Sequence, residues 1–294
     1  MAVINSPTVD PAVAPRTKRT FKFGTSLVVI VCALFFVLPL LSMMRFSFQN
    51  VPMINLGKST LLKGWSSEGV TKAFRDKEFQ SALALSVKLA VGTVLLTLVL
   101  LIPTTLWVHI RIPKARAFVE FLTVLPYVIP SIALVAGVLP LKPHARWFLN
   151  SNYSLIPFYA VLALPFTYRS LDAGIKAIDV KTLVDAARSL GAGWGTVLRK
   201  AIIPNIRAAI ISASFLTAAV VLGEYTMARL LLKRTLPAFM AQYQGREPQG
   251  GMALALTALV GTTLLFVLLS VLTRPRGARR RAAKVRSVPS EEVA

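Results

Sequence analysis

Long apolar runs separate the charged segments of this chain, and they constrain its fold more than any other feature of the sequence. Crossing the hydrocarbon of a bilayer, about 30 Å, requires roughly 20 apolar residues in a helix. Six runs approach that length, although the fourth and fifth are short; they lie at about 24–44, 82–108, 118–139, 153–168, 206–222 and 252–272. We therefore expect an all-α integral membrane protein with six transmembrane helices.

The composition also favours a membrane protein over a soluble one. Hydrophobic residues make up 55 % of the 294 residues and charged residues only 16 %, whereas soluble domains carry roughly 25 % charged residues. The one cysteine, Cys32, lies inside the first run, so an intramolecular disulfide is excluded. These features exclude an ordinary soluble enzyme, a disulfide-rich secreted domain and a disordered chain.

The net charge of +22 is distributed beside the apolar runs. Nucleic-acid-binding domains instead gather their bases on one face of a soluble body, so we expect no nucleic-acid partner. Bases cluster before the first run and after the last, and the positive-inside rule places such clusters in the cytoplasm. Both termini are therefore predicted to be cytoplasmic, in disordered tails at 1–23 and 274–294 that flank a transmembrane domain at 24–273.

The segment 169–205, between the fourth and fifth runs, is too polar to enter the bilayer and has helical periodicity. One helical face is predicted to carry Leu183, Val184, Ala187 and Leu190. Thr182 and Asp185 have the spacing of a capping box at the start of that helix. Gly191 and Gly193 are expected to end it, because glycine readily adopts the left-handed conformation.

A second amphipathic piece follows the two glycines and ends at Pro204. Its apolar side is predicted to carry Trp194, Val197, Leu198 and Ala201. A helix–turn–helix with an apolar face in water requires a covering surface. We expect this cytoplasmic loop to dock on a protein partner, with an interfacial helix lying on lipid as the alternative.

The same loop resembles the EAA signature of the permease subunits of type I ABC importers, whose pattern is Glu-Ala-Ala-x3-Gly-x9-Ile-x-Leu-Pro. The corresponding residues, at the same spacings, are Asp185, Ala186, Ala187, Gly191, Ala201, Ile203 and Pro204. Asp185, Ala201 and Ile203 replace the Glu, Ile and Leu of the pattern, and each change preserves charge or apolarity. The resemblance extends over about residues 24–273.

This resemblance implies the type I permease fold, in which the loop couples the membrane helices to a cytoplasmic ABC ATPase dimer. The docking residues would be Asp185, Ala186, Ala187, Gly191, Ile203 and Pro204. ATP binding would then shift the population between two packings of the spans. The resemblance also implies a second permease subunit, expected to be a different chain, and an extracytoplasmic solute-binding protein, in a bacterial inner membrane.

The chain itself is not expected to bind ATP, a metal or another cofactor. Gly57-Lys58-Ser59-Thr60 imitates the end of a phosphate-binding loop, but Pro52 stands where the first glycine of that motif belongs. His109 and His144 lie on opposite sides of the membrane in the predicted topology, so they cannot share a metal. We expect a transport subunit and not an enzyme, with ATP hydrolysed by the partner.

The stretch from Gly223-Glu224-Tyr225 to Met252 suggests the solute. It resembles permeases for polyamines, ferric iron, thiamine or phosphonates more than those for sugars. We favour a spermidine/putrescine-type solute because Glu224 and Tyr225 offer a carboxylate and a ring face to an ammonium. Glu224 and Tyr225, at the outer end of the fifth run, and Lys88, inside the second, are the candidates for the translocation path.

Other interpretations of these charges stay open. Lys88 could extend its ammonium to the outer surface, and Glu224 could be a solvated carboxylate at a helix end. Glu120 is expected to pair with Arg116 or Lys114. A transporter driven by an ion gradient is the alternative from a different class, but such transporters usually contain repeated halves with broken helices, and the sequence shows no such repeat.

Overall fold

The computed structural model describes residues 23–49, 54 and 64–273. The predicted tails lie outside these residues, except that Phe23 is the first residue of a helix. Pro52 and the segment resembling a phosphate-binding loop, 57–60, also lie outside them. Nearly all of the described residues are helical, and their one β pairing is an isolated bridge between Gln49 and Trp65.

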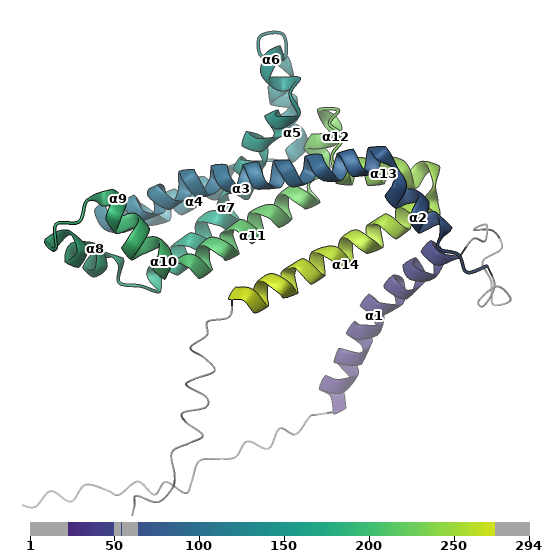
Figure 1. Ribbon diagram of the computed structural model, residues 1–294, viewed down its shortest axis with the longest axis horizontal. Helices are drawn as coiled ribbons and strands as arrows, with labels where there is room; N and C mark the ends of the chain where they lie inside the picture. Colours follow the sequence, from purple (N-terminus) through teal and green to yellow (C-terminus); the bar gives the residue numbers. More distant parts are fainter. Residues whose placement is uncertain (1–22, 50–53, 55–63, 274–294) are drawn as a thin grey trace, which may run out of the picture.

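Figure 1 shows the described helices in chain order. The α-helices are α1 (Phe23–Phe48), α2 (Glu68–Arg75), α3 (Lys77–Arg111), α4 (Arg116–Val128), α5 (Ser131–Val138), α6 (Arg146–Leu149), α7 (Leu155–Lys176), α8 (Val180–Ser189), α9 (Trp194–Thr196), α10 (Ile203–Asn205), α11 (Arg207–Gly223), α12 (Thr226–Leu230), α13 (Leu236–Arg246) and α14 (Pro248–Thr273). Short 3-10 turns occupy Pro113–Ala115, Leu139–Leu141 and Asn152–Ser154, and a π-helical stretch spans Val197–Ile202.

Three long helices, α3, α7 and α11, pack on one another at the centre of the molecule, and α4 packs on α7. Small residues let these helices approach closely: a Cβ on Gly174 of α7 would collide with the side chain of Ala209 on α11. The buried hydroxyls of Thr167 on α7 and Thr217 on α11 share a hydrogen bond of 2.7 Å. Close packing and internal hydrogen bonds are the forces that associate helices in a bilayer, where lipid supplies no hydrophobic drive.

Helices α1 and α14 pack on each other and diverge from the central bundle (Figure 1). The first of them has almost no protein cover, since every side chain from Leu27 to Ser42 is exposed. A helix with so much uncovered apolar surface is stable in hydrocarbon and not in water. The exposure of α1 therefore agrees with the membrane environment that the composition predicts.

Two helical segments are individually long and apolar enough to cross a membrane, Ser26–Phe48 and Lys77–Arg111. The number rises to four if each of two bent pairs is one span; these are Pro113–Val128 with Ser131–Leu141, and Trp194–Asn205 with Arg207–Gly223. The predicted fourth and sixth runs form α7 and α14, which do not meet this criterion within the described residues. The count of six spans stays a prediction.

The predicted third span, 118–139, is not one straight helix. Its residues form α4 and α5, which belong to a pair of segments bent by 82°. Pro130 has no amide hydrogen and disfavours the helical conformation of the residue before it. Ile129 accordingly adopts the extended φ of −75° and ψ of 123°. As a result, α5 and α6 project sideways from the bundle as an arm (Figure 1).

A buried lysine anchors this arm. Lys233, in the connection between α12 and α13, donates hydrogen bonds from Nζ to the backbone carbonyls of Leu149 and Asn150, each 2.8 Å long. These carbonyls lie at the end of α6, where no intrahelical donor reaches them. The lysine thus fixes the tip of the arm to the segment that follows α11.

Helix α7 is longer than the predicted fourth span. We expected a span at 153–168 followed by a loop from 169, but the helix runs from Leu155 to Lys176. Its last two turns are polar in sequence, yet their side chains find partners within the bundle: Ser170 donates to the carbonyl of Ala209 at 3.2 Å. The connecting loop therefore begins eight residues later than predicted.

Candidate functional site

The two ends of the central bundle carry different polar segments (Figure 1). Helices α8, α9 and α10 lie at one end, beside the end of α3. Helices α2 and α13 lie near the opposite end. We call residues 180–205 the α8–α10 segment, which is the part of the chain with the predicted docking residues.

Asp179 caps the start of α8. Its carboxylate accepts hydrogen bonds from the amide of Thr182 at 3.3 Å and from the Thr182 hydroxyl at 2.6 Å. The predicted capping box at Thr182 and Asp185 is therefore wrong, because the helix begins two residues before Thr182 and uses a different acid. Both bonds, the one from the hydroxyl first, lower the pKa of the Asp179 carboxyl from its ordinary value of 3.8. Since the folded-state pKa is lowered, this cap stabilises α8 at neutral pH and is lost as the pH falls through that lowered pKa.

Gly191 ends α8 in the way the sequence predicts. Its φ is +78°, and the amide of Ala192 bonds to the carbonyl of Ala187 while the amide of Gly191 bonds to that of Arg188, at 3.1 and 2.9 Å. This pair of bonds is the Schellman motif, which requires a left-handed residue after the helix. No heavy atom lies within 4 Å of a Cβ built on Gly191. The backbone conformation, and not lack of space, therefore favours glycine here.

The apolar face of the α8–α10 segment is buried inside the chain. Val184 of α8 and Val197 of the π-helical stretch are each 1 % exposed, and they pack in one cluster with Leu106 of α3 and Ile175 of α7. The expectation that this face is open to water is therefore wrong for its centre. The cluster fixes the segment against the ends of α3 and α7, so the three parts form one body.

The surface of the segment is small and only locally apolar. Among the residues matched to the permease pattern, Asp185, Ala186, Gly191 and Pro204 are exposed, while Ala187 and Ile203 are partly buried. Leu190, predicted to share the buried face, is 89 % exposed instead. We call Asp185, Ala186, Leu190 and Gly191 the exposed ridge. Its one large apolar side chain is that of Leu190, and Ala186 and Gly191 beside it are small.

A buried carboxylate joins three helices next to this segment. Asp172 of α7 pairs with His109 of α3 (Nε2–Oδ1, 2.8 Å), Arg116 of α4 (Nε–Oδ1, 2.8 Å) and Lys176 of α7 (Nζ–Oδ2, 2.6 Å). Its side chain is 7 % exposed. A carboxylate so removed from water is stable only when paired and hydrogen-bonded. We call these four residues the Asp172 cluster.

Asp172 was not among the site residues predicted from the sequence. The predicted fourth span ended at Tyr168, which placed an acid four residues later in water. Two signals were available: the spacing of four residues between Asp172 and Lys176, and the bases at the ends of neighbouring apolar runs. The predicted pairing of Glu120 with Arg116 or Lys114 is wrong, since Glu120 pairs with Arg169 at 3.1 Å and Arg116 pairs with Asp172.

Glu224 follows α11 and caps α12. Its two carboxylate oxygens accept hydrogen bonds from the amide of Met227 at 2.9 and 3.1 Å, and the amide of Ala228 is 3.5 Å away. The carboxylate is half-buried and neighbours the buried Tyr159. Tyr225 is exposed beside it. Lys88 is exposed on α3 and forms no ion pair within the described part of the chain.

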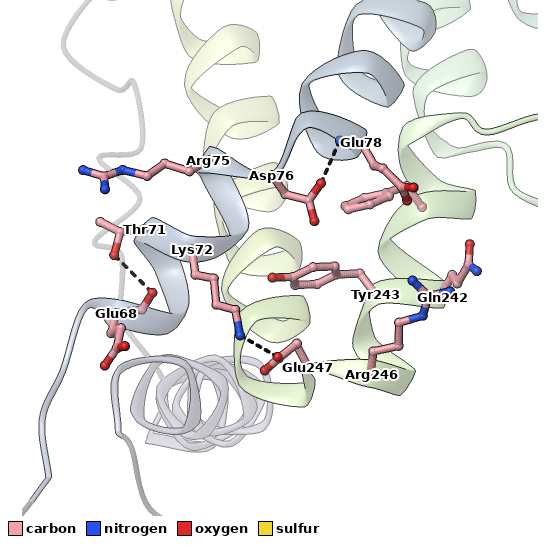
Figure 2. A pocket seen from close by; sticks show the side chains of 11 residues that line it. Glu68, Thr71, Lys72, Arg75, Asp76, Glu78, Gln242, Tyr243, Arg246 and Glu247 are labelled. Atoms are coloured by element: carbon pink, nitrogen blue, oxygen red, sulfur yellow. Dashed lines mark hydrogen bonds and ion pairs between the residues drawn. The ribbon is translucent and has the colours of Figure 1, made fainter.

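A hollow of about 600 Å³ lies between α2, the start of α3 and α13 (Figure 2). Its lining contains the acids Glu68, Asp76, Glu78 and Glu247 and the bases Lys72, Arg75 and Arg246, with aromatic rings from Phe239 and Tyr243. Lys72 donates a hydrogen bond of 2.7 Å from Nζ to Oε1 of Glu247, which raises the pKa of Lys72, and burial raises the pKa of Tyr243. Charges of both signs around aromatic rings suit a polar, mixed-charge partner.

Within the described residues, no group of three or more His, Cys, Asp or Glu side chains is placed to hold a metal ion.

Residues 102–276 match the family model described as the binding-protein-dependent transport system inner membrane component. A curated relative, the probable ABC transporter permease protein y4fN of Sinorhizobium fredii (strain NBRC 101917 / NGR234), is 25 % identical over 263 residues. The match covers 81 % of this chain and 45 % of the relative, so the chain spans about half the length of that protein.

A solved structure has a similar fold. It is described as the crystal structure of a bacterial ABC transporter involved in the import of the acidic polysaccharide alginate. The TM-score is 0.66 with 16 % sequence identity, and the match covers 90 % of this chain and 99 % of the other. At this identity the likeness concerns the arrangement of the helices.

The Asp172 cluster generates a prediction about stability. Asp172→Asn should lower the free energy of unfolding by about 1–3 kcal/mol, because the buried carboxylate loses the charge that pairs it with His109, Arg116 and Lys176. The matched control is Glu120→Gln, which breaks an exposed ion pair between the same two helices and should change stability by less than about 1 kcal/mol. Thermal unfolding of the detergent-purified chain measures both. Equal effects of the two substitutions would contradict a structural role for the cluster.

Proposed function

This chain belongs to the family of binding-protein-dependent transport system inner membrane components, the type I ABC importer permeases, and we propose that it forms half of the translocation path of an ATP-driven importer. The family makes it a transport subunit and not an enzyme, and a multi-pass protein of the inner membrane. The observation that carries the proposal is the α8–α10 segment, a rigid surface at one end of the bundle with a small, exposed ridge.

The coupling step of the proposal rests on how this segment is held. The exposed ridge offers Leu190 and the low surface of Ala186 and Gly191 to an ATPase subunit, with Ile203 and Pro204 on the following helix. Behind the ridge, Val184 and Val197 pack on α3 and α7. A push on the ridge would therefore move these helices together, because packed interiors transmit displacement with little compression.

The Asp172 cluster extends this connection. Through Arg116 it links α7 to α4, a helix that ends near the Pro130 bend and the projecting arm. ATP binding by the partner would then select one of two packings of the helices, provided that the ATPase binds the two packings with different affinity.

The proposed assembly contains two ABC ATPase subunits, a second permease subunit and a solute-binding protein. With both termini in the cytoplasm, the α8–α10 segment also faces the cytoplasm, and α2 and α13 face outward. The mixed-charge hollow of Figure 2 would then lie on the side from which a solute-binding protein approaches. Complementary charge at such a surface would increase the rate of association and fix the docking register.

For the solute we propose a cation of the spermidine/putrescine type, with ferric iron, thiamine, phosphonate or sugar as alternatives. Glu224 supports a cation because it places a half-buried carboxylate beside Tyr225, which exposes an aromatic ring. The different-class alternative is a transporter driven by an ion gradient. It would not explain why the spacing of these residues matches the permease pattern, since no ATPase would dock there.

Replacement of Gly191 tests the coupling proposal. Gly191→Val should abolish most ATP-driven uptake, because a β-branched residue at a φ of +78° costs about 1–3 kcal/mol and distorts the ridge. Gly193→Val is the matched control: Gly193 is equally exposed and uncrowded, but its φ of −71° and ψ of 161° suit valine. Uptake into vesicles and the amount of inserted protein are measured together. Wild-type uptake in Gly191→Val would contradict the proposal.

Replacement of Glu224 tests the solute. Glu224→Gln keeps an acceptor for the amide of Met227 but removes the negative charge. Uptake of spermidine at saturating binding protein should fall several-fold, while Glu120→Gln, which removes the same charge at the other end of the bundle, should leave uptake nearly unchanged. Unchanged uptake in Glu224→Gln would contradict a role for this carboxylate in the path.

A further inference from the structure

A second hollow, of about 390 Å³, lies where the end of α3 meets α8. It is lined by Ile110 and Arg111 of α3, by Lys181, Val184, Asp185 and Arg188 of α8, and by Trp194. The ionisable groups are three bases and one carboxylate, so the hollow attracts anions. Asp185 belongs to the ridge of the coupling proposal, but that proposal assigns no role to the three bases.

Two tryptophans hold the arginines of this hollow. The guanidinium of Arg188 lies 5.0 Å from the ring centroid of Trp194, and that of Arg111 lies 5.9 Å from the ring of Trp107. Cation–π contacts of this kind orient a guanidinium and leave its N–H donors free at the edge. None of the three bases forms an ion pair with a carboxylate in the described part of the chain. The donors are thus available to an external anion.

The position of the hollow indicates where that anion comes from. Arg111 is the last residue of α3, a helix of 35 residues that is long and apolar enough to cross a membrane. Trp107, one turn earlier, and Ile112, just after it, are both exposed. Tryptophan beside arginine at the end of a spanning helix is typical of the membrane–water interface. A ligand would therefore reach the hollow from the layer of lipid headgroups.

We propose that this hollow binds the phosphate headgroup of an anionic phospholipid from the inner leaflet. Basic pockets between helices on the cytoplasmic side of a membrane bind such headgroups. Arg111 and Arg188 would donate to the phosphate oxygens and Lys181 would add charge, while the acyl chains extend along the exposed surface near Trp107. Asp185 is the one carboxylate in the lining and is outnumbered by the three bases. The bound lipid would join the end of α3 to α8. The proposal depends on the cytoplasmic orientation proposed above, and not on the solute.

The test compares two triple variants of the full chain. Arg111→Gln/Lys181→Gln/Arg188→Gln removes the bases of the hollow, while Arg199→Gln/Lys200→Gln/Arg207→Gln removes three exposed bases outside it and is the charge-matched control. Short-chain phosphatidylglycerol, phosphatidylcholine and inorganic phosphate are titrated in detergent, and bound ligand is counted by native mass spectrometry. Lys181→Gln alone, at an exposed position, serves if the triple variant fails to fold.

The proposal expects the dissociation constant for phosphatidylglycerol to rise at least tenfold in the first variant, about threefold in Lys181→Gln, and less than twofold in the control. Equal losses in both triple variants would show general charge attraction and overturn the site. No loss would overturn it as well, and so would inorganic phosphate binding as tightly as the lipid. Loss of the lipid when the ATPase assembles would assign the hollow to an acidic side chain of that partner. Copurification of the ATPase with each variant is measured separately. Failure of the coupling proposal can therefore be distinguished from failure of the lipid site.

Discussion

The carboxylate of Asp172 pairs with bases from α3, α4 and α7 at the end of the bundle where the α8–α10 segment packs. A buried carboxylate cannot be left unpaired without a large loss of stability, so these helix ends have to keep their relative positions. The apolar cluster around Val184 and Val197 depends on that arrangement, because it includes Leu106 at the end of α3 and Ile175 at the end of α7. The Schellman turn at Gly191 then sets the direction of the ridge that the cluster supports.

This arrangement separates a stiff end from a looser one. Near the α8–α10 segment, ionic and apolar contacts hold four helices, whereas α1 contacts the rest chiefly through α14 and α2. In the proposed importer, the stiff end would receive the movement of the ATPase and the looser helices would repack in lipid. The stiff end could then move as a rigid body without internal change, while the other helices change between two discrete packings. The proposed lipid at the end of α3 would add a further contact at the stiff end.

Much of this organisation could be predicted from the sequence. The apolar runs predicted the helices, and the spacing of alanines, glycine and proline predicted both the family and the left-handed Gly191. Pro130 could have indicated the bend after Ile129, but the apolar run favoured one straight span instead. Tertiary pairing determined the rest. Asp172 can be buried because Arg116 and His109, 56 and 63 residues earlier in the chain, pair with it. Local sequence patterns do not reveal pairs so far apart in the chain. The cap of α8 is local, since Asp179 bonds Thr182 three residues later, and the predicted Thr182–Asp185 pair was wrong because the helix start was placed too late.

The most direct test of the central claim, that the exposed ridge contacts the ATPase, is the reactivity of a cysteine at Leu190. Cys32 is the one native cysteine, so Leu190→Cys in a Cys32→Ser background carries a unique thiol. The rate of maleimide labelling is compared between the chain alone and the assembled transporter, with Ala241→Cys, exposed on α13 at the opposite end, as the reference. The account predicts that assembly slows labelling at position 190 at least tenfold and leaves position 241 unchanged. Equal labelling of position 190 in both states would contradict it.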